Sequence, residues 1–146
     1  MSAASIRYEF EGTLNGTASR FLLDVGRYVH APNVTSLTLL APVLDEDNNP
    51  TAELEILDIL TVNPPATPLF LLDPDTDIVI SHNTADSDFG NEMLGLLVTG
   101  GIIEDAPYTQ VRTGMAINPV FAMTDTFRDW VLAQREKNAD TAAATA

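Results

Sequence analysis

The acidic loop around residue 75 has the spacing most suggestive of chemistry. Asp73, Asp75 and Asp77 stand at alternate positions, and alternate side chains of a tight loop can converge on one hard cation, as in positions 1, 3 and 5 of an EF-hand. Position 6 of that pattern needs glycine and holds Ile78, and position 12 needs a bidentate glutamate and holds Thr84. An EF-hand is therefore excluded, and the loop is either a looser calcium site or an Asx-rich turn.

A second loop repeats this pattern. Asp45, Asp47 and Asn49 have the same alternate spacing, but Pro50 stands at position 6 and Ile56 at position 12. The same two interpretations apply, a looser calcium site or an exposed acidic turn.

A Ser-His-Asp triad would need one of the two histidines, His30 or His82. Ser81 precedes His82 directly, and on a strand the two side chains would point to opposite faces. The chain has no Gly-x-Ser-x-Gly motif of the kind that presents a nucleophilic serine. We expect His82 to lie at the edge of a loop and His30, before Ala31-Pro32, to have a turn or capping role.

Paired carboxylates occur twice, at Glu53 with Glu55 and at Asp86 with Asp88. Glycoside hydrolysis needs one carboxyl group held protonated in a pocket, and the flanking residues predict solvated surfaces instead. The absence of cysteine excludes thiol nucleophiles and cysteine-based zinc sites. The sequence thus predicts a protein that is not an enzyme, with no catalytic or cofactor-binding residues and no cofactor; a hydrolase remains the remote alternative.

Charge restricts the partners. The formal net charge is −14, and Lys137 is the only lysine. Such a field repels phosphate backbones and anionic lipid surfaces, so we expect neither nucleic acid nor a membrane as partner. The acidity fits a solubilising surface, a high-salt organism or a partner with basic patches. The patch by which a partner protein contacts this chain should be neutral or basic, unless salt screens the charge.

The first half of the chain favours strands. Residues 6–11 alternate apolar and polar side chains, the period of a half-buried strand, and Asn15-Gly16 supplies a turn. Residues 19–30 are compatible with a helical stripe or with short strands, and we favour strands. Two further strands are expected at residues 34–44 and 52–62.

The second half is more ambiguous. Two apolar runs, 69–72 and 78–80, flank a turn and suggest a hairpin or paired edge strands. Residues 93–98 could form a buried strand or a short helix, and 108–117 is expected to be one strand.

The last element is predicted to be a helix. Thr124 is a suitable N-cap, Asp125 complements the positive helix N-terminus, and Phe127, Trp130 and Val131 share one face.

These elements predict a mainly β fold, a β-sandwich or jelly-roll-like body with a C-terminal helix. An α+β fold is the alternative if residues 19–30 and 92–99 are helical. We expect one globular domain over residues 1–139 and a flexible low-complexity tail over residues 140–146.

Two neighbouring segments of the chain resemble a sequence pattern found in a known class of proteins. Residues 21–28 (Phe-Leu-Leu-Asp-Val-Gly-Arg-Tyr), followed by residues 33–39 (Asn-Val-Thr-Ser-Leu-Thr-Leu), resemble the sequence of two paired strands in virion β-sandwiches. The Ala/Thr-rich ends are similar to arms that order on assembly. The chain thus resembles small accessory structural proteins of tailed-phage-type virions, of the capsid decoration or cement type. The resemblance implies a trimer or another symmetric homo-oligomer on a larger protein scaffold.

We therefore expect a structural or assembly protein that works by protein–protein contact. A soluble β-domain binding module, with or without stabilisation by calcium, is the alternative. The N-terminus lacks the basic and apolar regions of a secretory signal, and the apolar runs are too short for a membrane helix. We expect location in the virion if the resemblance holds, and otherwise in the cytoplasm.

Overall fold

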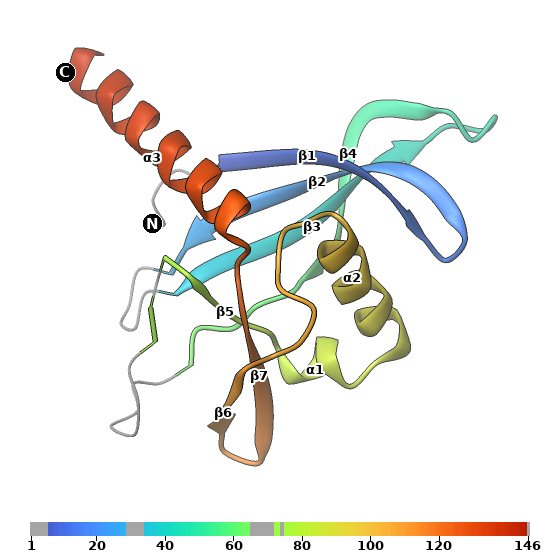
Figure 1. The fold of residues 1–146 in the computed structure, drawn as a ribbon. Coiled ribbons are helices and arrows are strands. Elements are labelled where there is room, and N and C mark those ends of the chain that lie inside the picture. The colour runs from blue at the N-terminus through green and yellow to red at the C-terminus, as the bar shows by residue number, and fades with distance from the viewer. Residues whose placement is uncertain (1–5, 29–33, 65–71, 74, 146) are drawn as a thin grey trace.

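The computed structural model describes residues 6–28, 34–64, 72–73 and 75–145, with side chains described up to residue 138. It is mainly β, with two antiparallel sheets and a long C-terminal helix (Figure 1). The predicted fold class is confirmed at this level, and the helical alternative for residues 19–30 is wrong, since residues 17–27 form one continuous strand.

The larger sheet has four strands in chain order. They are β1 (Ile6–Leu14), β2 (Thr17–Arg27), β3 (Thr35–Leu44) and β4 (Pro50–Ile59). The β1–β2 turn falls on Asn15 and Gly16, both with positive φ, as the Asn-Gly pair predicts. The described residues of the two segments that carry the resemblance, 21–28 and 34–39, lie at the pairing between β2 and β3, with Leu23 opposite Leu39.

The smaller sheet has the order β5-β7-β6. Its strands are β5 (Asp77–Val79), β6 (Thr109–Thr113) and β7 (Ala116–Ala122). The expectation of one strand over residues 108–117 is wrong, because the chain reverses at Gly114, which has a φ of 65°. Pro119 is tolerated in the central strand β7 because it lies beyond the three residues of β7 that pair with β5. Residues 69–71 of the expected hairpin lie outside the described residues.

Three helices follow from local signals. They are α1 (His82–Ala85), α2 (Asp88–Thr99) and α3 (Asp125–Thr145). The open choice at residues 93–98 resolves as helix, because the Ser87 hydroxyl caps α2 by accepting a hydrogen bond from Gly90 N at 2.8 Å. The predicted cap of α3 is confirmed, since Thr124 Oγ1 accepts from Phe127 N at 3.2 Å. Residues 140–145, expected as a tail, continue α3.

One face of the larger sheet is covered. The covering elements are α2, the start of α3, residues 102–103 and the smaller sheet (Figure 1). We call this the inner face; its buried side chains are Ile6, Phe10, Phe21, Leu23, Val25, Leu37 and Leu39. The fit is close at Gly12, where a Cβ would meet Leu96 Cδ1 at 2.3 Å.

Candidate functional site

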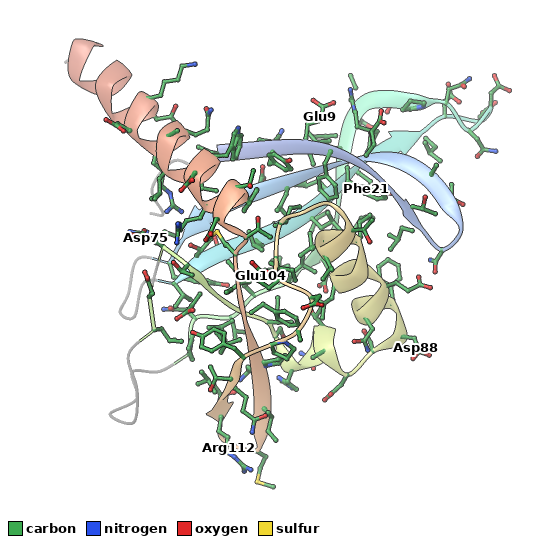
Figure 2. All side chains as sticks on the ribbon, in the orientation of Figure 1. Glu9, Phe21, Asp75, Asp88, Glu104 and Arg112 are labelled. Atoms are coloured by element: carbon green, nitrogen blue, oxygen red, sulfur yellow. The ribbon has the colours of Figure 1, made fainter. Side chains whose placement is uncertain are left out.

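The opposite face of the larger sheet carries the most distinctive surface in the described part of the chain. We call it the outer face, and the strand register arranges its central side chains in three rows across the sheet. The middle row is Glu9, Leu22, Leu40 and Ile56, and on one side lies the row Arg7, Asp24, Thr38 and Ile59. On the other side the pairs Glu11–Arg20 and Pro42–Leu54 make up the third row, which is interrupted between Arg20 and Pro42 because β2 and β3 no longer pair there. Glu9 projects from the side of β1 away from α2 in Figure 2.

The β3 and β4 half of the outer face is apolar. Ile56 is 62% exposed and Ile59 is 55% exposed, although both are isoleucines in a strand. Leu44, beyond the rows at the end of β3, is 51% exposed. Leu40 is buried at the centre of this half. Exposed large apolar side chains within a polar border are typical of a protein-contact site.

An irregularity in β4 enlarges this surface. Leu39 is opposite Asp58 and Leu40 is opposite Ile56, so Leu57 is an extra residue between the two pairs. Such a β-bulge shifts the alternation of side chains by one position. Leu57 consequently packs against the core, and Ile56 and Ile59 both face outward.

The β1 and β2 half of the outer face is charged, and four of its five charged side chains form ion pairs. Arg7 donates to both carboxylate oxygens of Asp24, at 2.7 and 3.2 Å, and Arg20 Nη1 lies 2.8 Å from Glu9 Oε1. The hydrogen bond to Asp24 is the main reason why the pKa of Arg7 is raised. These pairs leave a patterned charge without a large excess of either sign.

A hollow opens where the two hairpins of the larger sheet diverge. Pairing between β2 and β3 ends at Leu22 opposite Leu40. Beyond that point a space of about 700 Å³ separates the hairpins, with Arg20, Pro42 and Leu44 in its walls. The outer face therefore continues into a concave region at this end.

The predicted calcium ligands are engaged in separate contacts. Asp73 Oδ1 accepts from Asp75 N at 2.9 Å, and Asp77 Oδ2 accepts from Asp73 N at 2.7 Å. Asp75 forms ion pairs with Arg27 and Arg135. These contacts are those of an Asx-rich turn, the second of the two interpretations of this loop.

Buried charge in this region is held by hydrogen bonds. Asp77 is 4% exposed, and its Oδ1 accepts from the Tyr108 hydroxyl at 2.5 Å. Burial and then the hydrogen bond to Asp77 raise the pKa of Tyr108. Burial is the main cause of the lowered pKa of Arg135.

The second acidic loop is a tight turn between β3 and β4. Asp45 Oδ1 accepts from the backbone amides of Asp47 and Asn49, both at 2.9 Å. Within the described residues, no group of three or more histidine, cysteine, aspartate or glutamate side chains is placed to hold a metal ion.

The candidate hydrolytic residues have structural contacts. His82 begins α1, and its backbone amide donates to Asn118 Oδ1 at 2.9 Å. The Ser81 hydroxyl caps the same helix by accepting from Asn83 N. His30 lies outside the described residues.

The candidate carboxylate pairs lie on the surface. Glu53 and Glu55 are exposed on β4. Asp86 follows α1 as its C-cap, and Asp88 lies in the first turn of α2.

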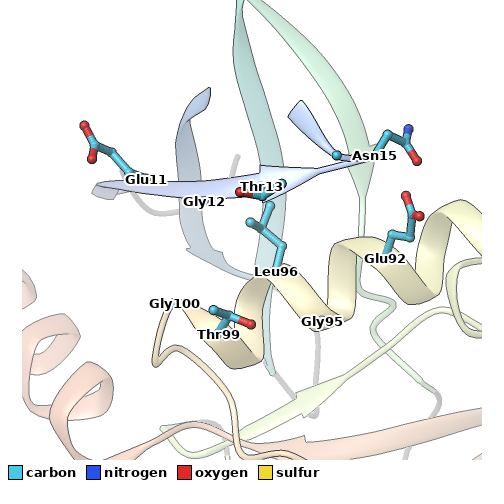
Figure 3. Close-up of a pocket in the computed structure, with 10 residues that line it drawn as sticks. Glu11, Gly12, Thr13, Asn15, Glu92, Gly95, Leu96, Thr99 and Gly100 are labelled. Atoms are coloured by element: carbon cyan, nitrogen blue, oxygen red, sulfur yellow. The ribbon is translucent and has the colours of Figure 1, made fainter. Parts of the chain in front are cut away.

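A groove of about 430 Å³ lies between β1 and α2 (Figure 3). Glu11 and Glu92 line it, but Glu11 points away from α2 while Glu92 points toward Asn15. The two carboxylates therefore do not face a common point, and much of the remaining lining is glycine backbone. The groove does not offer the paired acid and base that hydrolysis requires.

Comparison with protein-family models, curated proteins and solved structures found no match for this chain. Among the described residues, no helix has both the length and the apolar character needed to cross a membrane.

The outer face was not predicted from the sequence, although a signal for it existed. Leu22 follows Phe21 and precedes Leu23, and Leu40 follows Leu39, so β2 and β3 contain continuous apolar runs. Continuous runs in strands indicate burial on both faces of a sheet. The described residues cover only one face of this sheet.

Proposed function

We propose that the protein is a structural or assembly protein that binds other protein subunits through its outer face. The observation that carries this proposal is the exposure of Ile56, Ile59 and Leu44 on the apolar half of that face, which no described residue covers. Exposing these side chains costs free energy in water, and a contact that buries them recovers it.

The rest of the outer face supports a protein as the partner. Its apolar centre and charged border match the anatomy of protein interfaces, where a desolvated core is surrounded by a polar rim. A net charge of −14 disfavours phosphate-rich partners.

The narrower proposal is an accessory protein of a tailed-phage-type virion, of the decoration or cement type. It is supported by the resemblance of residues 21–28 and 33–39 to the sequence of two paired strands in virion β-sandwiches. In this role the chain would bind a larger protein scaffold, and its location would be the virion.

The proposal is tested by sedimentation of extracts from the source of the protein. We expect the chain to sediment with large protein particles, and Ile56→Asp to release it into the slowly sedimenting fractions. Met115→Asp is the matched control, because Met115 is fully exposed at the β6–β7 turn, away from the outer face. Wild-type protein that sediments only as a free small species would overturn the proposal.

A further inference from the structure

We infer that the outer face binds the outer face of a second copy of this chain, about a twofold axis that lies between the two sheets. This inference rests on the proposed function, and it names one partner for the same surface. It is carried by the distribution of charge on the outer face and by the order of its three rows.

Charge identifies the second copy as the occupant. The three rows contain two arginines, Arg7 and Arg20, against three carboxylates, so this face carries a formal charge of −1 in a chain of net charge −14. Two copies that approach by this face keep most of their acidic groups apart. A strongly basic partner would find little attraction here, since the arginines already neutralise most of the acid.

The rows are complementary to themselves. A twofold axis perpendicular to the strands, over the middle row, brings the Arg7 row of one copy opposite the Glu11 row of the other. Register then places Arg7 opposite Glu11 of the second copy, and Asp24 opposite Arg20. Each contact occurs twice by symmetry, as an isologous interface requires.

The apolar side chains meet in the same arrangement. The middle row faces itself, so Leu22, Leu40 and Ile56 of the two copies come together. Ile59 faces Leu54 of the second copy. Glu9 faces its own symmetry mate, and the adjacent Arg20, 2.8 Å away, offsets that repulsion. Two packed sheets of this kind lie about 10 Å apart.

The size of the surface predicts a weak dimer. Four strands about 4.8 Å apart, over about six residues of about 3.4 Å each, give a footprint of roughly 400 Å². A standard stable complex buries about 800 Å² on each partner. We therefore expect association that depends on concentration, with a dissociation constant of micromolar order.

Sedimentation velocity of the purified chain over a range of concentrations and salt tests the dimer. We expect a monomer–dimer equilibrium that becomes tighter as salt is raised from low to physiological concentration, because screening reduces repulsion between the acidic bodies. A monomer at every concentration would overturn the inference.

Two apolar-to-aspartate variants locate the interface. Ile56→Asp places a carboxylate at the twofold contact and should weaken dimerisation at least about tenfold. Met115→Asp adds the same charge at an exposed turn and should leave the dissociation constant within about twofold of wild type. Equal effects of both variants, or none from Ile56→Asp, would place the interface elsewhere and overturn the inference.

Charge reversal tests the axis itself. Glu11→Arg raises the net charge by two units, which should favour association if only bulk repulsion matters. The twofold arrangement predicts the opposite, about fivefold weakening, because position 11 then faces Arg7 of the second copy. Glu53→Arg makes the same charge change at an exposed position of β4 that alternates with Leu54, and it should not weaken the dimer. Weakening by both variants, or by neither, would overturn this axis.

Thermal melting accompanies each measurement, so that loss of the fold is distinguished from loss of the contact. The failures of the two proposals are also distinguishable. A purified monomer that still sediments with particles in extracts, and is released by Ile56→Asp, would leave the proposed function standing without the dimer. A chain that is monomeric in both settings would remove both proposals.

Discussion

The two faces of the larger sheet differ although the same strands build them. Leu22 and Leu23 are neighbours in β2, yet Leu23 is 0% exposed beneath the covering elements and Leu22 faces outward beside Leu40. On the inner face, apolar side chains stabilise the fold. On the outer face, similar side chains remain partly in water, so their burial can instead stabilise an association. The comparison separates residues needed for folding from residues available for contact.

Truncating Leu23 should have the largest effect on the free energy of unfolding, and truncating its neighbour Leu22 provides the comparison. Leu23→Ala should lower the free energy of unfolding by about 3 kcal/mol, because it leaves a cavity in the core. Leu22→Ala should lower it by less, about 1–2 kcal/mol, since Leu22 is only partly buried and solvent can fill the space left. Urea denaturation at low protein concentration, where the chain is monomeric, measures both. Equal losses would mean that the outer face belongs to the folding core.

A polar contact on the inner side should have a smaller effect. The hydroxyl of buried Thr84, on α1, donates to Asp58 Oδ2 at 2.9 Å and connects the helix to β4. Thr84→Val keeps the shape of the side chain but removes this donor. We expect a loss of about 1–2 kcal/mol in urea denaturation, as for other hydrogen bonds to charged groups. Thr38→Val, at an outer-face position, is the control and should change stability much less.

The hydrogen bond between Tyr108 and the Asp77 carboxylate, at the smaller sheet, should make stability depend on pH. Tyr108→Phe removes the donor to Asp77 and should cost no more than about 1 kcal/mol near neutral pH, because Tyr108 is 60% exposed. The pKa of Tyr108 is higher in the folded chain than its ordinary value of 10.0. The contribution of the Tyr108 hydroxyl to the free energy of unfolding is therefore complete below about pH 10, and it is lost as pH rises through the folded-state pKa of Tyr108.

Denaturation of wild type and Tyr108→Phe across neutral and alkaline pH checks this expectation. The two stabilities should converge above about pH 10. A difference that grows with pH would contradict the assigned hydrogen bond.

The smallest effect is expected for the exposed ion pairs of the outer face. Arg7→Ala and Asp24→Ala should each change stability by less than about 1 kcal/mol, and a double-mutant cycle should give a coupling of about 0.5 kcal/mol that falls with added salt. The pair is bidentate, but the Arg7 side chain is 48% exposed. A large coupling that salt does not change would show that this part of the outer face is shielded from water in the monomer.

Local patterns predicted the elements that depend on neighbouring residues. The alternation of residues 6–11 identified β1, Asn15-Gly16 identified its turn, and Thr124 identified the start of α3. The same approach missed the hairpin of β6 and β7, because Val111 and Ile117 look like parts of one strand unless Gly114 is recognised as its turn. It also left residues 93–98 open, since a short apolar run fits either a buried strand or a helix.

The sequence by itself determined the mainly β class, the terminal helix, the exclusion of cysteine chemistry and the acidic character that restricts partners. Tertiary structure alone decided that Asp75 pairs with Arg27 and Arg135, that Asp77 meets Tyr108, and that one face of the larger sheet stays uncovered. The physical reason is that local periodicity follows from backbone geometry over a few residues. Which face is covered, and which charges meet, depends on segments tens of residues apart that approach only when the chain has packed.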